Sequence, residues 1–190
     1  MNDLKQVVWF VRDTLKCRVS CVVGHSKGTG IILNYAAWEQ QQKQENNGES
    51  VPCFVNLAGK FSVPTTIDPI LRKFTAEQQK EMRQNNEFVL MKRGEKILEV
   101  TRDELLLRAN QDTKSIISSI MDAPTFAMLT IHGEADKSIP VDHARQFDAS
   151  GIPNHELVII EGADHSFNGL RHMETITSAI SEFLKRHVEA

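Results

Sequence analysis

Apolar residues near the start of the chain recur every three or four positions: Leu4, Val7, Val8, Val11 and Leu15. This spacing places them on one face of an amphipathic helix, which we predict over residues 3–16. The run CRVSCVV at 17–23 is nearly continuous in apolar residues and is typical of a strand. We therefore expect a helix that leads directly into the first strand of a sheet.

The next pattern indicates one strand, helix and strand in succession. The glycine-flanked segment GHSKGTG separates the first strand from a helix-like stretch at 31–41, and a polar loop at 41–50 precedes a strand-like run at 51–59. Strands joined through a helix pair in parallel. We predict an α/β fold with a mostly parallel sheet and flanking helices.

The alternation of strands and helices breaks between residues 61 and 123. The polar stretch 75–86 predicts a short helix, and 87–100 predicts a hairpin. Thr101 and Glu104 have the spacing of a capping box at a helix start. We interpret 61–123 as an insertion within a single domain that spans residues 1–190.

The alternation then resumes up to the C-terminus. Strands are predicted at 124–131 and 155–160, and each is followed by a polar loop and then by a helix, at 141–150 and 173–188. We find no internal repeat and no segment that predicts a membrane span.

Composition narrows the class of protein. The chain is 41% hydrophobic and 25% charged with a formal charge of −3, and its basic residues form no stripe, so we expect no nucleic-acid partner. Charges interrupt the N-terminal apolar residues, so we expect no signal-peptide core there. Cys17, Cys21 and Cys53 lack metal-type pairing, and we expect buried free thiols in a cytoplasmic protein.

Three chemically capable residues follow three predicted strands. Ser26, Asp136 and His165 each lie just after a strand end, and the carboxyl ends of parallel strands gather ligands and catalytic groups. A serine hydroxyl needs a base to accept its proton, and the imidazole of His165 suits that task. A carboxylate such as Asp136 would hold the imidazole in the required tautomer.

Glycines flank the serine for a separate reason. A sharp turn from strand to helix strains the backbone at Ser26, and we expect side chains to clash at Gly24 and Gly28. The helix that begins there directs its first N–H groups at the site, so the backbone N–H of Lys27 is the expected oxyanion donor.

Other polar residues near these motifs have structural interpretations. Asp164 is the rival acid, but its adjacency to His165 makes the required hydrogen bond awkward, so we expect it to fix its loop. His25 and His132 are expected to support loops. The four remaining histidines lack partners for ligation, and we expect no metal and no cofactor; they are His143, His155, His172 and His187.

Together, the motifs GHSKG, HGEADKSIP and GADHSF, in the order Ser, Asp, His, resemble the α/β-hydrolase fold. The likeness is to lipase-like and feruloyl-esterase-like serine hydrolases with a small inserted cap. It implies cleavage of a small-molecule carboxylic ester through an acyl-enzyme. Eight apolar residues would line a pocket under the cap or form the core of the cap itself: Phe61, Ile67, Ile70, Leu71, Phe74, Phe88, Leu90 and Met91.

The resemblance also implies strands ahead of the nucleophile strand, whereas this chain begins one helix before it. We therefore expect an N-terminally truncated version of the fold, in which 17–23 is an exposed edge strand that favours self-association. The loop that donates a second oxyanion N–H would be absent. The alternative function is a non-catalytic ligand-binding or regulatory module, or an inactive fragment of a longer hydrolase.

Overall fold

The computed structural model describes residues 1–42, 50–61, 72, 74–85, 89–93, 96–101, 103–104, 113–121 and 126–188. The chain divides into two compact units. The first combines Met1–Phe61 with Thr113–Ala190, and the second is Ser62–Asp112. We describe each unit by itself.

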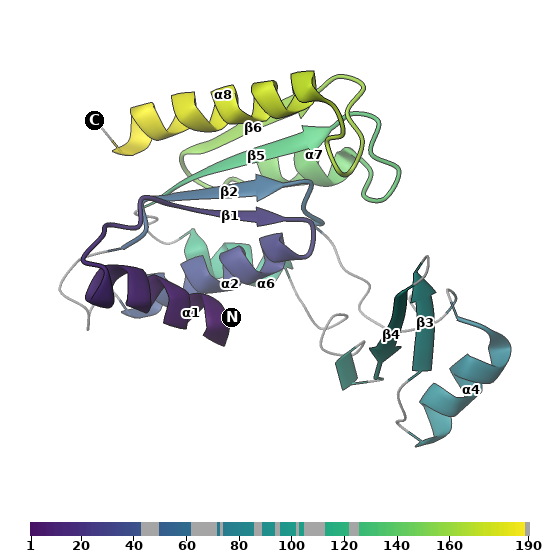
Figure 1. Ribbon diagram of the computed structural model, residues 1–190. Coiled ribbons are helices and arrows are strands. Elements are labelled where there is room, and N and C mark those ends of the chain that lie inside the picture. The colour runs from purple at the N-terminus through teal and green to yellow at the C-terminus, as the bar shows by residue number, and fades with distance from the viewer. Residues whose placement is uncertain are drawn as a thin grey trace. The chain divides into compact units, whose positions relative to one another are not determined.

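A four-stranded parallel sheet forms the centre of the first unit (Figure 1). Its strands, in spatial order, are β1 (Cys21–His25), β2 (Cys53–Leu57), β5 (Ala127–Gly133) and β6 (His155–Ile160). The spatial order equals the order along the chain, because each new strand is added beside the previous one. This arrangement confirms the predicted parallel sheet.

Helices cover both faces of the sheet (Figure 1). They are α1 (Asn2–Trp9) with its π-helical continuation η1 (Phe10–Thr14), α2 (Gly28–Gln41), α6 (Thr113–Ile120), α7 (Asp142–Asp148) and α8 (Leu170–Val188). The alternation along β2 divides the core, since Phe54 packs with residues of α2 and α6 whereas Cys53 and Val55 pack on the α8 side.

A buried carboxylate joins the N-terminal helices to the sheet. Glu39 of α2 accepts hydrogen bonds from the Arg12 guanidinium (3.1 Å), the Tyr35 hydroxyl (3.1 Å) and the Val51 N–H (2.8 Å). Burial and the adjacent Glu39 carboxylate raise the pKa of Tyr35. Three donors offset the desolvation of the carboxylate, so η1, α2 and the segment just before β2 are held together.

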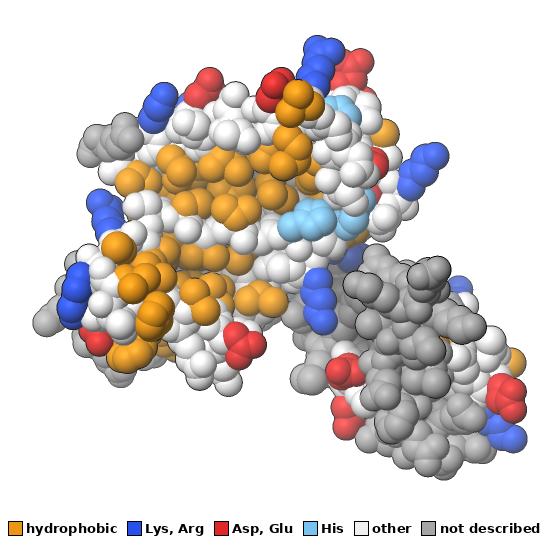
Figure 2. All heavy atoms as spheres, in the orientation of Figure 1, with side chains coloured by type: hydrophobic (Ala, Val, Ile, Leu, Met, Phe, Trp, Pro, Cys, Tyr) orange, Lys and Arg blue, Asp and Glu red, His pale blue; other side chains and the backbone are white. Residues whose placement is uncertain are grey.

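The first predicted helix is present, but its apolar face is only partly covered. Val8 is buried and Leu4 packs against the core, whereas Val7 and Leu15 are exposed. Trp9 and Phe10 are exposed as well. In Figure 2, apolar side chains gather between α8 and α1, along the β1 side of the sheet seen in Figure 1. Helical periodicity identified the helix but not the extent of its contacts.

The first strand differs from its predicted bounds. It begins at Cys21 rather than at residue 17, because the chain turns after η1 through Lys16, whose φ is +53°. Cys17 is therefore exposed, and its predicted burial is wrong. Cys53 is buried and Cys21 is half-buried, and all three thiols are free.

The second unit contains helix α4 (Ala76–Asn85) and the antiparallel hairpin of β3 (Val89–Arg93) and β4 (Lys96–Val100). The predicted helix and hairpin are confirmed. So is the capping box, since Thr101 N–H donates to Glu104 Oε2 (2.8 Å) and Glu104 N–H donates to Thr101 Oγ1 (3.1 Å).

The proposed pocket residues can be placed only in part. Phe61 packs in the core of the first unit, against the ring of Phe147, and Phe74 is buried. Ile67, Ile70, Leu71 and Phe88 lie outside the described residues, as do the side chains of Leu90 and Met91. Across the ranges that the structure describes, no helix combines the length and the apolar character needed to cross a membrane.

Candidate active site

The turn after β1 holds Ser26 in a left-handed backbone conformation, with φ of +55°. Its N–H donates to the carbonyl of Leu57 at the end of β2 (2.8 Å). A Cβ added at Gly24 would lie 2.7 Å from the carbonyl carbon and oxygen of Gly28, so only glycine fits there. The predicted steric requirement at Gly24 is confirmed.

The same expectation for Gly28 is wrong. A Cβ added at this position meets no atom within 4 Å. Gly28 is the first residue of α2, and a side chain there would occupy open space beside the helix rather than the narrow gap between β1 and α2. The sequence motif treats the two glycines alike, whereas the backbone geometry requires only the first.

Asp136 lies in the loop after β5, and its side chain is fully buried. One carboxylate oxygen accepts the N–H groups of Ser138 and Ile139, both at 2.8 Å, and the other accepts Nδ1–H of His165 at 2.7 Å. Burial opposes ionisation, but the Ile139 N–H, the His165 imidazole and the Ser138 N–H outweigh it and lower the pKa of Asp136. The group is a carboxylate near neutral pH.

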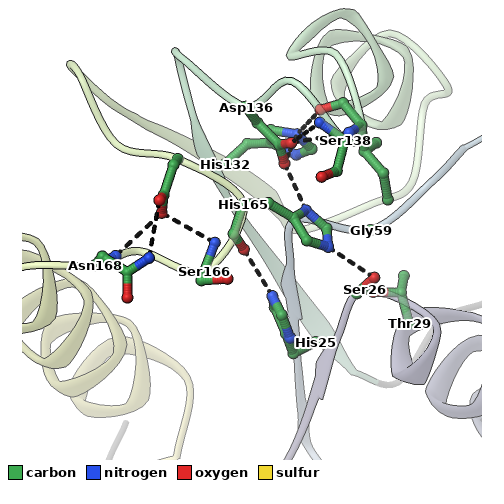
Figure 3. Close-up of polar contacts among 12 residues, drawn as sticks. His25, Ser26, Thr29, Gly59, His132, Asp136, Ser138, His165, Ser166 and Asn168 are labelled. Carbon is green, nitrogen blue, oxygen red and sulfur yellow. Dashed lines mark hydrogen bonds and ion pairs between the residues drawn. The ribbon is translucent and has the colours of Figure 1, made fainter. Parts of the chain in front are cut away.

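His165 lies between the other two residues (Figure 3). Its Nδ1 is 2.7 Å from Asp136 Oδ2, and its Nε2 is 2.9 Å from Ser26 Oγ. Because Nδ1–H donates to the carboxylate, Nε2 carries the lone pair and accepts the serine O–H. The structure thus brings together all three residues singled out by the sequence, although 139 positions separate Ser26 from His165.

Two further histidines support these loops, as expected. His25 donates Nε2–H to the carbonyl of His165 (2.9 Å), and His132 donates Nε2–H to the carbonyl of Ile139 (2.9 Å). His132 Nε2 also lies 3.4 Å from Asp136 Oδ2, and both side chains are fully buried. The two histidines therefore hold the backbone of the loops that carry His165 and Asp136 (Figure 3).

Asp164 has the loop-fixing role that the sequence favoured. Its carboxylate accepts the N–H groups of Ser166 and Asn168, both at 3.1 Å, and the side-chain amide of Asn168 at 2.9 Å. These bonds, that of the Asn168 side chain above all, lower the pKa of Asp164. Asp136, and not Asp164, is bonded to the imidazole of His165.

The residue expected to donate to an oxyanion follows Ser26 directly. Lys27 is the N-cap of α2, so its N–H belongs to the group of helix-initiating N–H donors that have no partner within the helix. The positive end of the α2 dipole adds to the attraction for a negative oxygen. Among the residues that the structure describes, no group of three or more His, Cys, Asp or Glu side chains could hold a metal ion.

Polar residues under the turn escaped the sequence analysis. Thr29, Asn56 and Thr130 are buried, and Asn56 is hydrogen-bonded to both threonines. A signal was present for two of them, because Asn56 and Thr130 are isolated polar residues in strand-like runs, CFVNL and AMLTIHG, that are otherwise apolar around them. An amide in the middle of a core strand requires buried hydrogen-bond partners, which is the signal that these residues carry.

No protein-family model and no curated protein sequence matches the chain. Solved structures do match. The chain is similar to the esterase domain of a Rhodothermus marinus protein (12% identity, TM-score 0.65, 98% of this chain and 68% of that one). It is also similar to Est1E of Butyrivibrio proteoclasticus with bound ferulic acid (19%, 0.61, 88% and 59%).

A third similar structure is the monoacylglycerol lipase of Paleococcus ferrophilus (14% identity, TM-score 0.62, 98% of this chain and 75% of that one). The chain thus spans between 59% and 75% of the length of these three proteins. At such identities the likeness is one of architecture, and it agrees with the parallel sheet and flanking helices described above. The chain has the α/β-hydrolase fold.

Proposed function

We propose that this chain is a serine hydrolase that cleaves carboxylic esters through an acyl-enzyme. The observation that carries the proposal is the continuous hydrogen-bonded path from Ser26 Oγ to His165 Nε2 (2.9 Å) and from His165 Nδ1 to Asp136 Oδ2 (2.7 Å). Similarity to an esterase domain and to a monoacylglycerol lipase supports an ester as the substrate class.

In the first half-reaction, Ser26 Oγ attacks the carbonyl carbon of the ester while its proton passes to Nε2 of His165. The imidazole becomes a cation, which the Asp136 carboxylate stabilises through the bond to Nδ1–H. The N–H of Lys27 binds the negative oxygen of the tetrahedral intermediate. The intermediate then expels the alcohol, which takes the proton from Nε2.

In the second half-reaction, water replaces the alcohol. His165 removes a proton from the water as the water oxygen attacks the acyl carbon on Ser26. The second tetrahedral intermediate collapses, the carboxylic acid leaves, and the proton returns from Nε2 to Ser26 Oγ. His165 thus acts alternately as base and as acid. Its side chain is 20% exposed, which gives the alcohol and the water access to Nε2.

The first test is labelling of the purified protein with a fluorophosphonate, read by intact mass. Wild-type protein should gain one adduct, and Ser26→Ala and His165→Ala should not. Ser118→Ala is the matched control, since it removes the hydroxyl of an exposed serine on α6. Folded wild-type protein without an adduct would overturn the proposal.

Turnover of p-nitrophenyl esters is the second test. Labelled protein that also releases p-nitrophenol, with release abolished in Ser26→Ala, supports ester hydrolysis. Saturable binding of an apolar ester without release would instead favour a non-catalytic ligand-binding module.

A further inference from the structure

A row of buried polar side chains crosses the sheet under the Ser26 turn. Gly24 of β1, Asn56 of β2 and Thr130 of β5 are direct neighbours in the parallel register. Asn56 Oδ1 accepts the Thr29 hydroxyl at 2.7 Å, and Asn56 Nδ2 donates to Thr130 Oγ1 at 3.2 Å. Asn56 and Thr130 are fully buried.

The row continues to the surface through a histidine. Thr130 Oγ1 lies 2.8 Å from His155 Nε2, and His155 Nδ1 lies 3.3 Å from the Asp148 carboxylate. A carboxylate can only accept, so Nδ1 carries the proton and Nε2 accepts the Thr130 hydroxyl. Burial lowers the pKa of His155, in keeping with this neutral tautomer.

These donors and acceptors fix the orientation of the Asn56 amide. Thr130 Oγ1 uses its proton toward His155 and so offers a lone pair to Asn56 Nδ2. Asn56 Oδ1 then faces α2 and accepts both the Thr29 hydroxyl and the N–H of Gly59 (2.9 Å). All bonds in the row have one consistent direction, which leaves the amide a single arrangement.

Close packing around the amide adds a second constraint. A Cβ added at Gly59 would lie 2.1 Å from Asn56 Oδ1 and 2.3 Å from Thr29 Oγ1. The loop after β2 therefore closes directly over the bond between Thr29 and Asn56, and a side chain there would displace it.

The Ser26 turn is attached to this row on two sides. Thr29 lies in the first turn of α2; its N–H donates to the Ser26 carbonyl (3.2 Å) and its hydroxyl also lies 3.3 Å from the Gly24 carbonyl. On the other side, the Ser26 N–H donates to Leu57, the residue after Asn56. Displacement of Asn56 would thus shift both attachments of the turn.

We propose that Asn56 is a positioning residue, whose carboxamide holds the turn so that Ser26 Oγ remains within hydrogen-bond reach of His165. The role rests on the proposed function, because it concerns the reactivity of Ser26. An apolar side chain in this strand would stabilise the core without the desolvation that a buried amide requires. A buried amide at this position is explained by its hydrogen bonds, because Oδ1 holds Thr29 and Gly59 and Nδ2 is held by Thr130.

The test compares four variants by the kinetics of fluorophosphonate labelling. Asn56→Leu removes all three bonds of the amide, and Thr29→Val removes one hydroxyl with little change of shape. Thr29→Ser restores the hydroxyl. Thr113→Val is the control, because it alters a buried threonine of α6 outside the row.

Asn56→Leu and Thr29→Val should lower the maximal labelling rate by about 10- to 100-fold, since small misplacement of a reacting atom has effects of that order. The probe concentration that gives half of the maximal rate should stay within about twofold, because probe binding does not involve the row. Thr29→Ser should recover most of the rate. Thr113→Val should label as wild type does, even where its melting temperature falls.

A folded Asn56→Leu protein that labels at the wild-type rate would overturn the positioning role. If Asn56→Leu does not fold, the Thr29→Val and Thr29→Ser pair decides, and equal rates for the two reject the proposal. If wild type itself is not labelled, the proposed function fails while positioning is still tested by amide hydrogen exchange. Exchange at residues 24–30 should then accelerate in Thr29→Val but not in Thr29→Ser, and unchanged exchange rejects positioning.

Discussion

Strands β1 and β5 both lead into the candidate site, yet their surroundings differ sharply. All seven residues of β5 are buried, and β5 pairs with β2 on one side and β6 on the other. In β1 only Gly24 is buried, Val23 is 49% exposed, and the pairing within the described residues is with β2. The acid is thus presented from the sheet interior and the serine from its edge.

This difference indicates which contacts hold Asp136 and which hold Ser26 in place. Asp136 is held by the loop after a strand with two neighbours, and His132 of that strand supports the loop from within the core. Ser26 follows a strand that pairs, in the described part of the chain, with β2 alone, so its position depends on the Leu57 carbonyl and on the polar row through Asn56. Polar contacts with β2 and the loop after it can thus hold the turn that follows an edge strand.

The largest expected effect is at the acid on the interior side. Asp136→Asn should lower the fluorophosphonate labelling rate by about 10³- to 10⁴-fold, because an amide does not hold His165 in the tautomer that accepts the serine proton. Asp164→Asn is the matched control and should have a far smaller effect. Equal losses in the two variants would reject the assignment of Asp136.

Substitutions in the two strands should show the same difference between β5 and β1 in the free energy of unfolding. Leu129→Ala in β5 should lower the free energy of unfolding by about 2–5 kcal/mol, because the cavity lies in a fully packed interior. Val23→Ala in β1 should cost about 0.5 kcal/mol or less, since its side chain is half exposed. Urea denaturation gives both values, and equal losses would contradict the edge position of β1.

The reactivity of the three cysteine thiols compares the edge strand (Cys21), the sheet interior (Cys53) and the loop before β1 (Cys17). Burial raises the pKa of Cys21 to about 12, with a further contribution from Cys53, and burial raises the pKa of Cys53 to about 11. Cys17 is exposed. At pH 8, iodoacetamide should modify Cys17 at least about 100-fold faster than the other two, because the thiolate is the reactive form. Peptide mass spectrometry reads the three sites, and denaturant should equalise them.

The stability of the fold should depend on pH through His155, which lies on β6 at the other edge of the sheet from β1. The pKa of His155 lies below its usual 6.5 because burial disfavours the cation, and Asp148 and Glu156 offset this only in part. Below pH 6.5 the unfolded chain therefore binds more protons than the folded one. The stability from this group is complete above about pH 6.5 and falls as the pH drops through the folded pKa, by at most about 1.4 kcal/mol per pH unit.

Urea titrations between pH 5 and pH 7.5 would measure this slope in wild type and in His155→Gln. The slope should be smaller in the variant because it lacks the His155 imidazole, whereas His143, whose pKa burial also lowers, contributes to the slope equally in both proteins. Asp136, whose pKa is lowered from 3.8, loses its protonation-linked stability only at more acidic pH. An identical slope in the two proteins would show that His155 is not its source.

The smallest effect on stability is expected at the exposed edge itself. We propose that β1 favours self-association, because an edge strand offers unpaired backbone groups next to apolar side chains. Val23→Lys should change the free energy of unfolding by about 0.5 kcal/mol or less while reducing concentration-dependent association in sedimentation experiments. A wild-type chain that stays monomeric at all concentrations would reject this role for the edge.

Periodicity and motifs predicted the sheet, most helices and the three residues that meet at the site. These features depend on local pattern and on the rule that strand ends converge. The errors concern neighbours that no local pattern contains. The error at Gly28 could be found only from the backbone geometry, and the error at Cys17 only from the turn at Lys16. Asn56 was missed because its partners lie on α2, on β5 and in the loop after β2.

The order of strands in the sheet has a consequence for folding. β1 with β2, and β5 with β6, are pairs of strands close in sequence, whereas the β2–β5 ladder closes the long intervening segment that contains the second unit. Closure of long loops is entropically expensive and slow. We expect two half-sheets to form first and to join late. Ser26 belongs to one half and Asp136 and His165 to the other, so the hydrogen bond between Ser26 and His165 can form only when the halves join.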